Sequence, residues 1–270
     1  MTADDPIGVF DSGLGGLTVV RAIREALPSE RLVYLGDTAR VPYGTRSAHT
    51  ILRYARGCAR HLARDGIKLL VVACNTVSAV ALPMLRVELD VPVLGVIGPG
   101  ARAGVAATRS HRLGVIATPG TVASGAYPRA VASVSSRTEV FQRAAPLLVP
   151  LVEEGWTDGE VPRLVVDRYL EPLIAADIDS LVLGCTHYPL LADVIRDRVA
   201  AHSPHPVTVV DSAAATATEL EELIGERGMA RTGEGSLRLM VTDRPDQFAD
   251  EAARFLGASL EGLTVEAIDL

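Results

Sequence analysis

The stretch Leu181-Val-Leu-Gly-Cys-Thr-His-Tyr-Pro189 decides the expected fold. An apolar run ends at Cys185 and is followed at once by a hydroxyl, an imidazole and a proline. We interpret it as a buried strand that presents reactive side chains at its carboxyl end. Leu69-Leu-Val-Val-Ala-Cys-Asn-Thr76 has the same form and ends at Cys74. We therefore predict that the fold holds Cys74 and Cys185 on opposite sides of one small carbon acid.

Strand patterns alternate with helical patterns around these two stretches. Ile7-Gly-Val-Phe10 is a short apolar strand, and apolar residues recur at helical spacing from Leu17 to Leu27. Another strand, Leu32-Val-Tyr-Leu35, is followed by a helical pattern from Ser47 to Arg64 and then by the strand that ends at Cys74. Such alternation is typical of crossover units, so we predict an α/β protein with parallel sheets.

The series restarts after Pro99-Gly100. Leu113-Gly-Val-Ile-Ala-Thr-Pro-Gly-Thr-Val122 resembles the first strand and its turn, and Thr118 precedes Cys185 by nearly the interval that separates Asp11 from Cys74. We predict two similar parallel-sheet α/β domains with the active site between them. Residues 1–97 plus 209–270 form the first domain, which carries Cys74, and residues 98–208 form the second, which carries Cys185.

Composition narrows the class of protein. The chain has 270 residues, 4% aromatic residues and a net charge of -7, so nucleic acid is a poor candidate partner. The start carries acids where a secretory signal would be basic, and apolar runs fall short of the roughly 18 residues of a membrane helix. We expect a cytoplasmic protein with no membrane segment, whose 3 cysteines are reduced.

Two cofactor classes are disfavoured. Lys68 is the single lysine and lies at the entry of the strand that ends at Cys74, far from the strand tip. This position disfavours a pyridoxal phosphate Schiff base in a site at the strand tips. Asp11-Ser-Gly-Leu-Gly-Gly16, with Asp37 after the next strand, imitates a dinucleotide fingerprint. However, Thr18 occupies the third glycine position and Asp11 would repel a pyrophosphate. Ser12 and the N–H groups of the helix start suit a carboxylate instead.

His187 and Glu153 are candidate partners for Cys185. Two residues apart in an extended chain, His187 and Cys185 would project to the same side, where the imidazole could exchange a proton with the thiol. Alternatively, His187 packs against the next helix, and Glu153 is a solvated helix end. Zinc is disfavoured because no close pair of ligands accompanies Cys185 and His187. Cys58 lies in a helical pattern and is expected to be a buried apolar residue.

The sequence resembles the aspartate/glutamate racemase superfamily, and within it the glutamate racemases of peptidoglycan synthesis. The matching stretches are Gly8-Val-Phe-Asp-Ser-Gly-Leu-Gly-Gly16, Gly36-Asp37 with Pro42-Tyr-Gly44, Cys74-Asn-Thr76, Pro146 to Gly155, and Gly184-Cys-Thr-His-Tyr-Pro189. The resemblance implies a racemase that interconverts L- and D-glutamate without a cofactor or metal, and that forms a homodimer.

The resemblance also implies roles for individual residues. Cys74 would remove the α-proton of the D isomer and Cys185 that of the L isomer. Asp11, with Asp37 as a second helper, would assist Cys74, whereas His187 and Glu153 would assist Cys185. The residues expected around the substrate are Asp11, Ser12, Tyr43, Gly44, Asn75, Thr76, Thr118, Thr121, Thr186 and His187, with Thr118 and Thr121 near its carboxylate.

Several alternatives stay open at this point. An aspartate or hydantoin-type racemase has the same superfamily pattern, because the sequence does not measure the length of the pocket. A non-catalytic binding module could use the same pocket, and a nucleotide-dependent oxidoreductase is a further rival from a different class.

Overall fold

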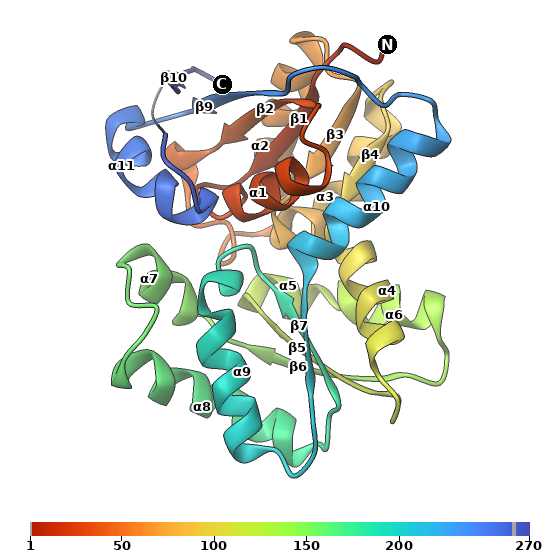
Figure 1. Ribbon diagram of the computed structural model, residues 1–270, viewed down its shortest axis with the longest axis vertical. Coiled ribbons are helices and arrows are strands. Elements are labelled where there is room, and N and C mark those ends of the chain that lie inside the picture. Colours follow the sequence, from red (N-terminus) through yellow and green to blue (C-terminus); the bar gives the residue numbers. More distant parts are fainter. Residues whose placement is uncertain (1, 261–262) are drawn as a thin grey trace.

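The computed structural model describes residues 2–260 and 263–270 and contains two stacked α/β domains (Figure 1). Met1 and residues 261–262, which belong to the predicted first domain, lie outside the described residues. One sheet has 6 strands in the order β10-β9-β2-β1-β3-β4, and the other has 4 strands in the order β6-β5-β7-β8. Every pair of neighbouring strands is parallel. The predicted fold class is confirmed.

The larger sheet is covered by helices on both faces. Alternate residues of β1 point to opposite faces, so Ile7 and Val9 pack with α1, α10 and α11, whereas Phe10 packs with α2 and α3. Its strands are β1 (Ile7–Asp11), β2 (Arg31–Gly36), β3 (Leu69–Val72), β4 (Val93–Gly95), β9 (Ser236–Val241) and β10 (Val265–Ala267). Its helices are α1 (Leu17–Ala26), α2 (Ala48–Arg64), α3 (Asn75–Glu88), α10 (Ser212–Glu226) and α11 (Pro245–Leu256), with the short η1 (Thr38–Arg40) after β2.

The smaller sheet is also covered on two faces. Leu113 and Val182 pack toward α4 and α6, whereas Ile116 and Leu183 pack in the cluster that contains α8 and α9. The strands are β5 (Arg112–Ala117), β6 (Glu139–Ala144), β7 (Ser180–Gly184) and β8 (Thr208–Asp211). The helices are α4 (Ile97–Ala107), α5 (Pro119–Ser124), α6 (Ala126–Val134), α7 (Leu148–Glu153), α8 (Glu160–Ala175), η2 (Tyr188–Leu191) and α9 (Ala192–His202).

The two halves repeat one strand order. In the first, β2-β1-β3-β4 are neighbours, and in the second, β6-β5-β7-β8 are neighbours in the same relative order. Cys74 follows β3 and Cys185 follows β7, which are equivalent strands beside the first strand of each half. This repeat supports the internal duplication inferred from sequence spacing.

Several element boundaries differ from the sequence prediction. Helix α3 begins at Asn75, directly after Cys74. After Cys185, the helical segment is divided into η2 and α9. Pro99-Gly100 lies in the first turn of α4, where the missing N–H of proline costs no helical hydrogen bond. The predicted second domain ended at residue 208, but β8 pairs with β7 up to Asp211, so the chain leaves the smaller sheet after Asp211.

Lys68 is completely buried at the end of the larger sheet opposite the strand tips. Its ammonium group donates hydrogen bonds to Glu30 Oε2 at 2.6 Å, to the carbonyl oxygen of Ala3 at 2.7 Å and to that of Met229 at 2.9 Å. Glu30 Oε1 accepts from the backbone N–H of Arg231 at 2.9 Å. One buried ion pair therefore joins the start of the chain, the entry to β2 and the segment before β9.

Within the described part of the chain, no helix combines the length and the apolar character needed to cross a membrane.

Candidate active site

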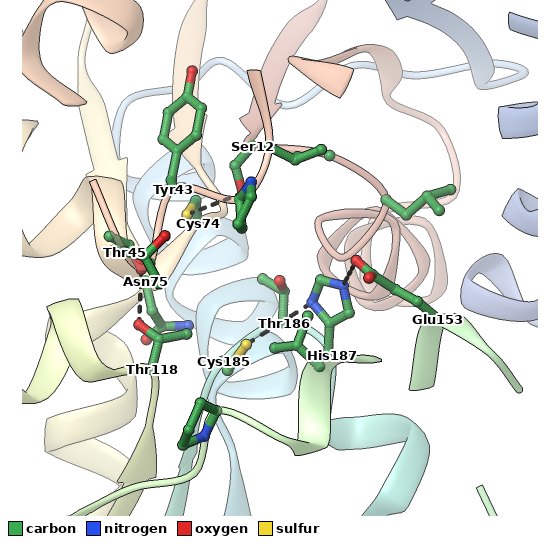
Figure 2. A pocket seen from close by; sticks show the side chains of 18 of the residues that line it. Ser12, Tyr43, Thr45, Cys74, Asn75, Thr118, Glu153, Cys185, Thr186 and His187 are labelled. Carbon is green, nitrogen blue, oxygen red and sulfur yellow. Dashed lines mark hydrogen bonds and ion pairs between the residues drawn. The ribbon is translucent and has the colours of Figure 1, made fainter. Parts of the chain in front are cut away.

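A cavity of about 310 Å³ lies between the two domains at the carboxyl ends of the strands. Figure 2 shows Cys74 and Cys185 projecting into it from opposite walls. The lining residues are Ser12, Gly13, Leu14, Val41, Pro42, Tyr43, Gly44, Thr45, Cys74, Asn75, Thr76, Thr118, Pro119, Pro146, Val149, Pro150, Glu153, Cys185, Thr186 and His187.

Each thiol stands where a strand turns into a helix. Cys74 is extended, with φ -69° and ψ 122°, and is the residue before the first turn of α3. Its side chain therefore lies at a helix N-terminus, where the helix dipole favours a negative charge. Both thiols are 6% exposed, so neither is in bulk water.

Cys74 lies in acidic surroundings. Its thiol donates to Ser12 Oγ at 3.6 Å, and the buried Asp11 lies nearby at the end of β1. Burial, reinforced by the negative charge of Asp11, raises the pKa of Cys74 to about 12. Burial also raises the pKa of Asp11, whose Oδ2 accepts from the N–H of Gly13 at 3.0 Å. Asp11 Oδ1 has no hydrogen-bond partner among the described residues and is free to take a proton or an ammonium hydrogen.

Cys185 has the opposite environment. Its Sγ lies 3.9 Å from His187 Nδ1, and His187 Nε2 lies 3.1 Å from Glu153 Oε1 (Figure 2). Burial disfavours the imidazolium, but the hydrogen bonds to Cys185 and Glu153 outweigh burial and raise the pKa of His187 to about 10. At neutral pH the imidazole is therefore protonated, and Cys185 lies beside a positive charge.

The geometry that joins Cys185 and His187 differs from our premise. We expected an extended chain, but β7 ends at Gly184 and His187 has helical angles, with φ -79° and ψ -33°. The N–H of Tyr188 donates to the carbonyl oxygen of Cys185 at 3.2 Å, which closes a turn. This turn brings the imidazole back toward the thiol.

Three hydroxyl groups from two domains meet at one end of the cavity. Thr76 lies 3.0 Å from Thr118 and 3.3 Å from Thr121, and Thr118 and Thr121 are 3.0 Å apart. Asn75 Oδ1 accepts from the hydroxyl of Tyr127 at 2.8 Å. Asn75 Nδ2 is buried and has no partner among the described residues. These donors suit a carboxylate, because carboxylate oxygens accept several hydrogen bonds at once.

Asp37 lies behind the cavity wall and does not line the cavity. It is buried, and its carboxylate accepts hydrogen bonds from the Tyr43 hydroxyl, from Arg40 Nε at 2.9 Å and from the Thr242 hydroxyl at 2.8 Å. Asp37 therefore holds Tyr43, which does line the cavity.

Most of the predicted site residues line the cavity, and the others stand directly behind it. Asp11, Asp37 and Thr121 are fully buried in this second layer. We did not predict Tyr127, which positions the Asn75 amide and has no local sequence signal, because packing between distant segments brings it here. We also did not predict the apolar wall, although most of its residues lie within the stretches that match the family. The apolar wall consists of Leu14, Val41, Pro42, Pro119, Pro146, Val149 and Pro150.

In residues 2–260 and 263–270, no group of three or more His, Cys, Asp or Glu side chains is placed so that it could hold a metal ion.

Two thiols that face one mostly apolar cavity from two parallel-sheet domains form the arrangement of a racemase. A racemase is an isomerase that removes a proton from one face of a carbon and returns one to the other face. Comparison with known proteins identifies the family. Residues 7–220 match the Asp/Glu/Hydantoin racemase family. The chain belongs to this family.

Individual relatives match along nearly the whole chain. The chain is 51% identical over 267 residues to a glutamate racemase of Syntrophus aciditrophicus (strain SB), covering 98% of this chain and 97% of the relative. The crystal structure of glutamate racemase isoform RacE1 from Bacillus anthracis has a TM-score of 0.93 and 38% identity, with 98% of each chain covered. That of the Francisella tularensis glutamate racemase in complex with D-glutamate has a TM-score of 0.90 and 34% identity, again covering 98% of each chain.

Proposed function

We propose that this protein is a glutamate racemase that interconverts L- and D-glutamate through two thiols and without a cofactor. The observation that carries the proposal is the placement of Cys74 and Cys185 on opposite walls of one cavity (Figure 2). Inversion at a carbon requires a proton acceptor on one face and a proton donor on the other. The close relatives named glutamate racemases support glutamate as the substrate.

In the direction from D- to L-glutamate, the Cys74 thiolate takes the α-proton and the Cys185 thiol delivers a proton to the opposite face. The C–H bond on one face breaks and a C–H bond on the other face forms, so no net proton or electron is consumed. Turnover leaves Cys74 as a thiol and Cys185 as a thiolate, which is the state that receives L-glutamate. The reverse reaction restores the first state.

Asp11 and His187 manage the protons of the two thiols. Because Cys74 rests as a thiol, its proton must leave before it can act as a base. Asp11 Oδ1 is a buried acceptor that has no hydrogen-bond partner within residues 2–260 and 263–270. The ammonium group of the substrate would offset the negative charge next to Cys74. On the other side, His187 exchanges a proton with Cys185, and Glu153 holds the imidazole in its orientation.

The carbanion needs stabilisation because the α-hydrogen of an amino acid is a very weak acid. We assign the substrate carboxylate to Asn75 Nδ2 and to the hydroxyls of Thr76 and Thr118, with Thr121 behind them. Donors fixed in a water-poor cavity stabilise developing charge without reorganising, which makes them more effective than water. Ser12, Tyr43, Gly44 and Thr186 complete the enclosure of the substrate.

Replacing each thiol tests the two-base mechanism. Cys74→Ala and Cys185→Ala are each expected to lower kcat for glutamate by at least about a thousandfold, because each removes one proton carrier. Circular dichroism of purified protein with L- or D-glutamate, and no added cofactor, measures the reaction. Cys58→Ala is the matched control, since Cys58 is a buried thiol in α2 that does not line the cavity. Full activity in either active-site variant contradicts the mechanism, and turnover of aspartate in preference to glutamate contradicts the substrate.

We further propose that the protein works as a homodimer in the cytoplasm, where it supplies D-glutamate for peptidoglycan and thus for the cell wall. The three free cysteines agree with a reducing compartment. A cluster of exposed apolar side chains on α7, α8 and their connection agrees with a second copy as the partner. The cluster consists of Leu147, Trp156, Val161 and Leu164, which are 54%, 54%, 46% and 60% exposed.

A further inference from the structure

Helix α11 of the larger domain reaches the end of α7 in the smaller domain, and Figure 1 shows the two helices on the same side of the molecule. Arg254 Nη1 donates hydrogen bonds to the carbonyl oxygen of Val152 at 3.0 Å and to that of Glu153 at 2.9 Å. These carbonyls belong to the last turn of α7, where the helix supplies no further N–H groups. A cation at this position also complements the negative end of the helix dipole.

The chain after α7 is shaped to receive the guanidinium group. Gly155 has a φ of 76°, in the left-handed region that favours glycine. A Cβ atom at Gly155 would lie 3.2 Å from Arg254 Nη1. The absence of a side chain therefore lets Arg254 approach the helix end closely.

The two residues at the end of α11 contact both partners of Cys185. Arg254 holds the backbone of Glu153, whose carboxylate is 3.1 Å from His187 Nε2. Phe255, the next residue, packs edge-on against the imidazole of His187, with ring centroids 5.5 Å apart and an interplanar angle of 84°. Glu153 and His187 belong to the smaller domain, whereas Arg254 and Phe255 belong to the larger one. Residues of the larger domain therefore contact both Glu153 and His187 across the domain interface.

We propose that Arg254 is a positioning residue for the Cys185 half of the site: it caps α7 from the opposite domain and so holds Glu153 against His187. The inference rests on the proposed function and deepens it. Without Arg254, the end of α7 frays, Glu153 turns toward water, and the imidazolium loses a partner. Arg254 itself is largely exposed, so the expected effect is moderate.

Steady-state kinetics of glutamate racemisation tests this role. Arg254→Ala is expected to lower kcat about tenfold while KM changes less than about twofold, because a misplaced catalytic group slows chemistry more than binding. Arg254→Lys should recover part of the loss, since lysine can still donate to the two carbonyls. Arg244→Ala is the matched control: Arg244 precedes the first turn of the same helix, is exposed, and donates to Gln247 at 3.2 Å. It should retain the wild-type kcat.

A double-mutant cycle separates positioning from general stability. If Arg254 acts through Glu153, then adding Arg254→Ala to Glu153→Gln should cause less than about a twofold further loss. The charged or titratable groups that face His187 are Cys185, Glu153 and Asp11. Since Glu153 would move away, the alkaline limb of the pH profile of kcat should shift to lower pH in Arg254→Ala, as it should in Glu153→Gln. A purely structural role would lower the melting temperature without moving this limb.

Wild-type kcat in Arg254→Ala, or a loss that multiplies fully with that of Glu153→Gln, overturns the inference while leaving the proposed function intact. Lack of glutamate turnover by the wild-type protein overturns the proposed function instead. In that case, nuclear magnetic resonance titration of the His187 imidazole still decides the inference. A lower His187 pKa in Arg254→Ala than in the wild type supports positioning, and an equal pKa refutes it.

Discussion

The two thiols differ more in their neighbours than in their positions. Cys74 adjoins Asp11, and burial raises the pKa of Cys74 to about 12. Cys185 adjoins His187, whose pKa rises to about 10 because its hydrogen bonds to Cys185 and Glu153 exceed the cost of burial. At neutral pH the Cys74 thiol therefore keeps its proton, whereas the Cys185 thiol lies beside a protonated imidazole. Two similar halves of a fold thus support an asymmetric pair of bases.

The raised pKa of His187 leads to a prediction about pH. The imidazolium is present below its pKa of about 10 and is lost above it, so kcat/KM for glutamate should fall as the pH rises through about 10. Glu153→Gln removes the carboxylate that stabilises the imidazolium, and the alkaline limb should move down by about one pH unit. The full pH profiles of both proteins measure this, and superimposable alkaline limbs would contradict it.

Individual site residues could be predicted where their immediate neighbours in the sequence form a recognisable pattern. Cys74, Cys185 and Glu153 each end an apolar run, His187 follows Cys185 by two residues, and all four side chains reach the cavity. Arg254 and Tyr127 were not predictable, because their partners lie far away in sequence and only packing brings them together. Gly15 is similar: a side chain there would overlap Thr186 and His187 of the other domain.

Among the secondary-structure elements, the buried strands were the easiest to predict from the sequence. The apolar runs identify β1, β3, β5 and β7, because strands buried on both faces have few polar residues. The exact helix starts were harder to predict. Polar residues such as Asn75 and Thr76 suit a loop or a helix start equally, and the observed helix begins directly after the thiol. Local preference alone does not choose between these conformations.

The apolar cluster on α7 and α8 leads to a prediction about the oligomeric state. Trp156→Glu should convert the proposed dimer to a monomer, because a charge in an apolar interface loses its hydration without gaining a partner. Light scattering coupled to gel filtration should give twice the 28.5 kDa chain mass for the wild type and one chain mass for the variant. Val87→Glu, an exposed apolar position on α3, is the control and should leave the mass unchanged. A monomeric wild type at micromolar concentration would rule out the dimer.

For the whole molecule, periodicity predicted two parallel sheets, and the repeated strand order supports the inferred duplication. The periodicity of the sequence does not predict which residues make contacts between the two domains. The hydroxyl of Thr18 donates to the carbonyl oxygen of Thr186 at 2.9 Å, and the N–H of Gly120 donates to that of Gly44 at 3.0 Å. The acceptor in each contact is a backbone carbonyl, which every residue type carries, so the sequence does not reveal the pairing.

The buried pair of Lys68 and Glu30 predicts a stability effect without a kinetic one. Lys68→Met leaves the Glu30 carboxylate buried without its cation, so the free energy of unfolding should fall by about 3–5 kcal/mol. The double variant Lys68→Met/Glu30→Leu should recover part of this loss, since both charges are then absent. Denaturant unfolding measures the change. The folded variants should keep the wild-type KM for glutamate, because the pair lies at the opposite end of the sheet from the cavity. An unchanged unfolding midpoint in Lys68→Met would contradict this prediction.

The burial of Lys68 also determines how the protein responds to chemical labelling. Its one lysine side chain is fully enclosed, so amine-directed reagents meet no accessible lysine while the fold is intact. Acylation or reductive methylation of Lys68 becomes possible when the chain opens around Glu30 and Met229. The rate at which this one amine is modified therefore reports how often the larger domain opens, with no engineered probe.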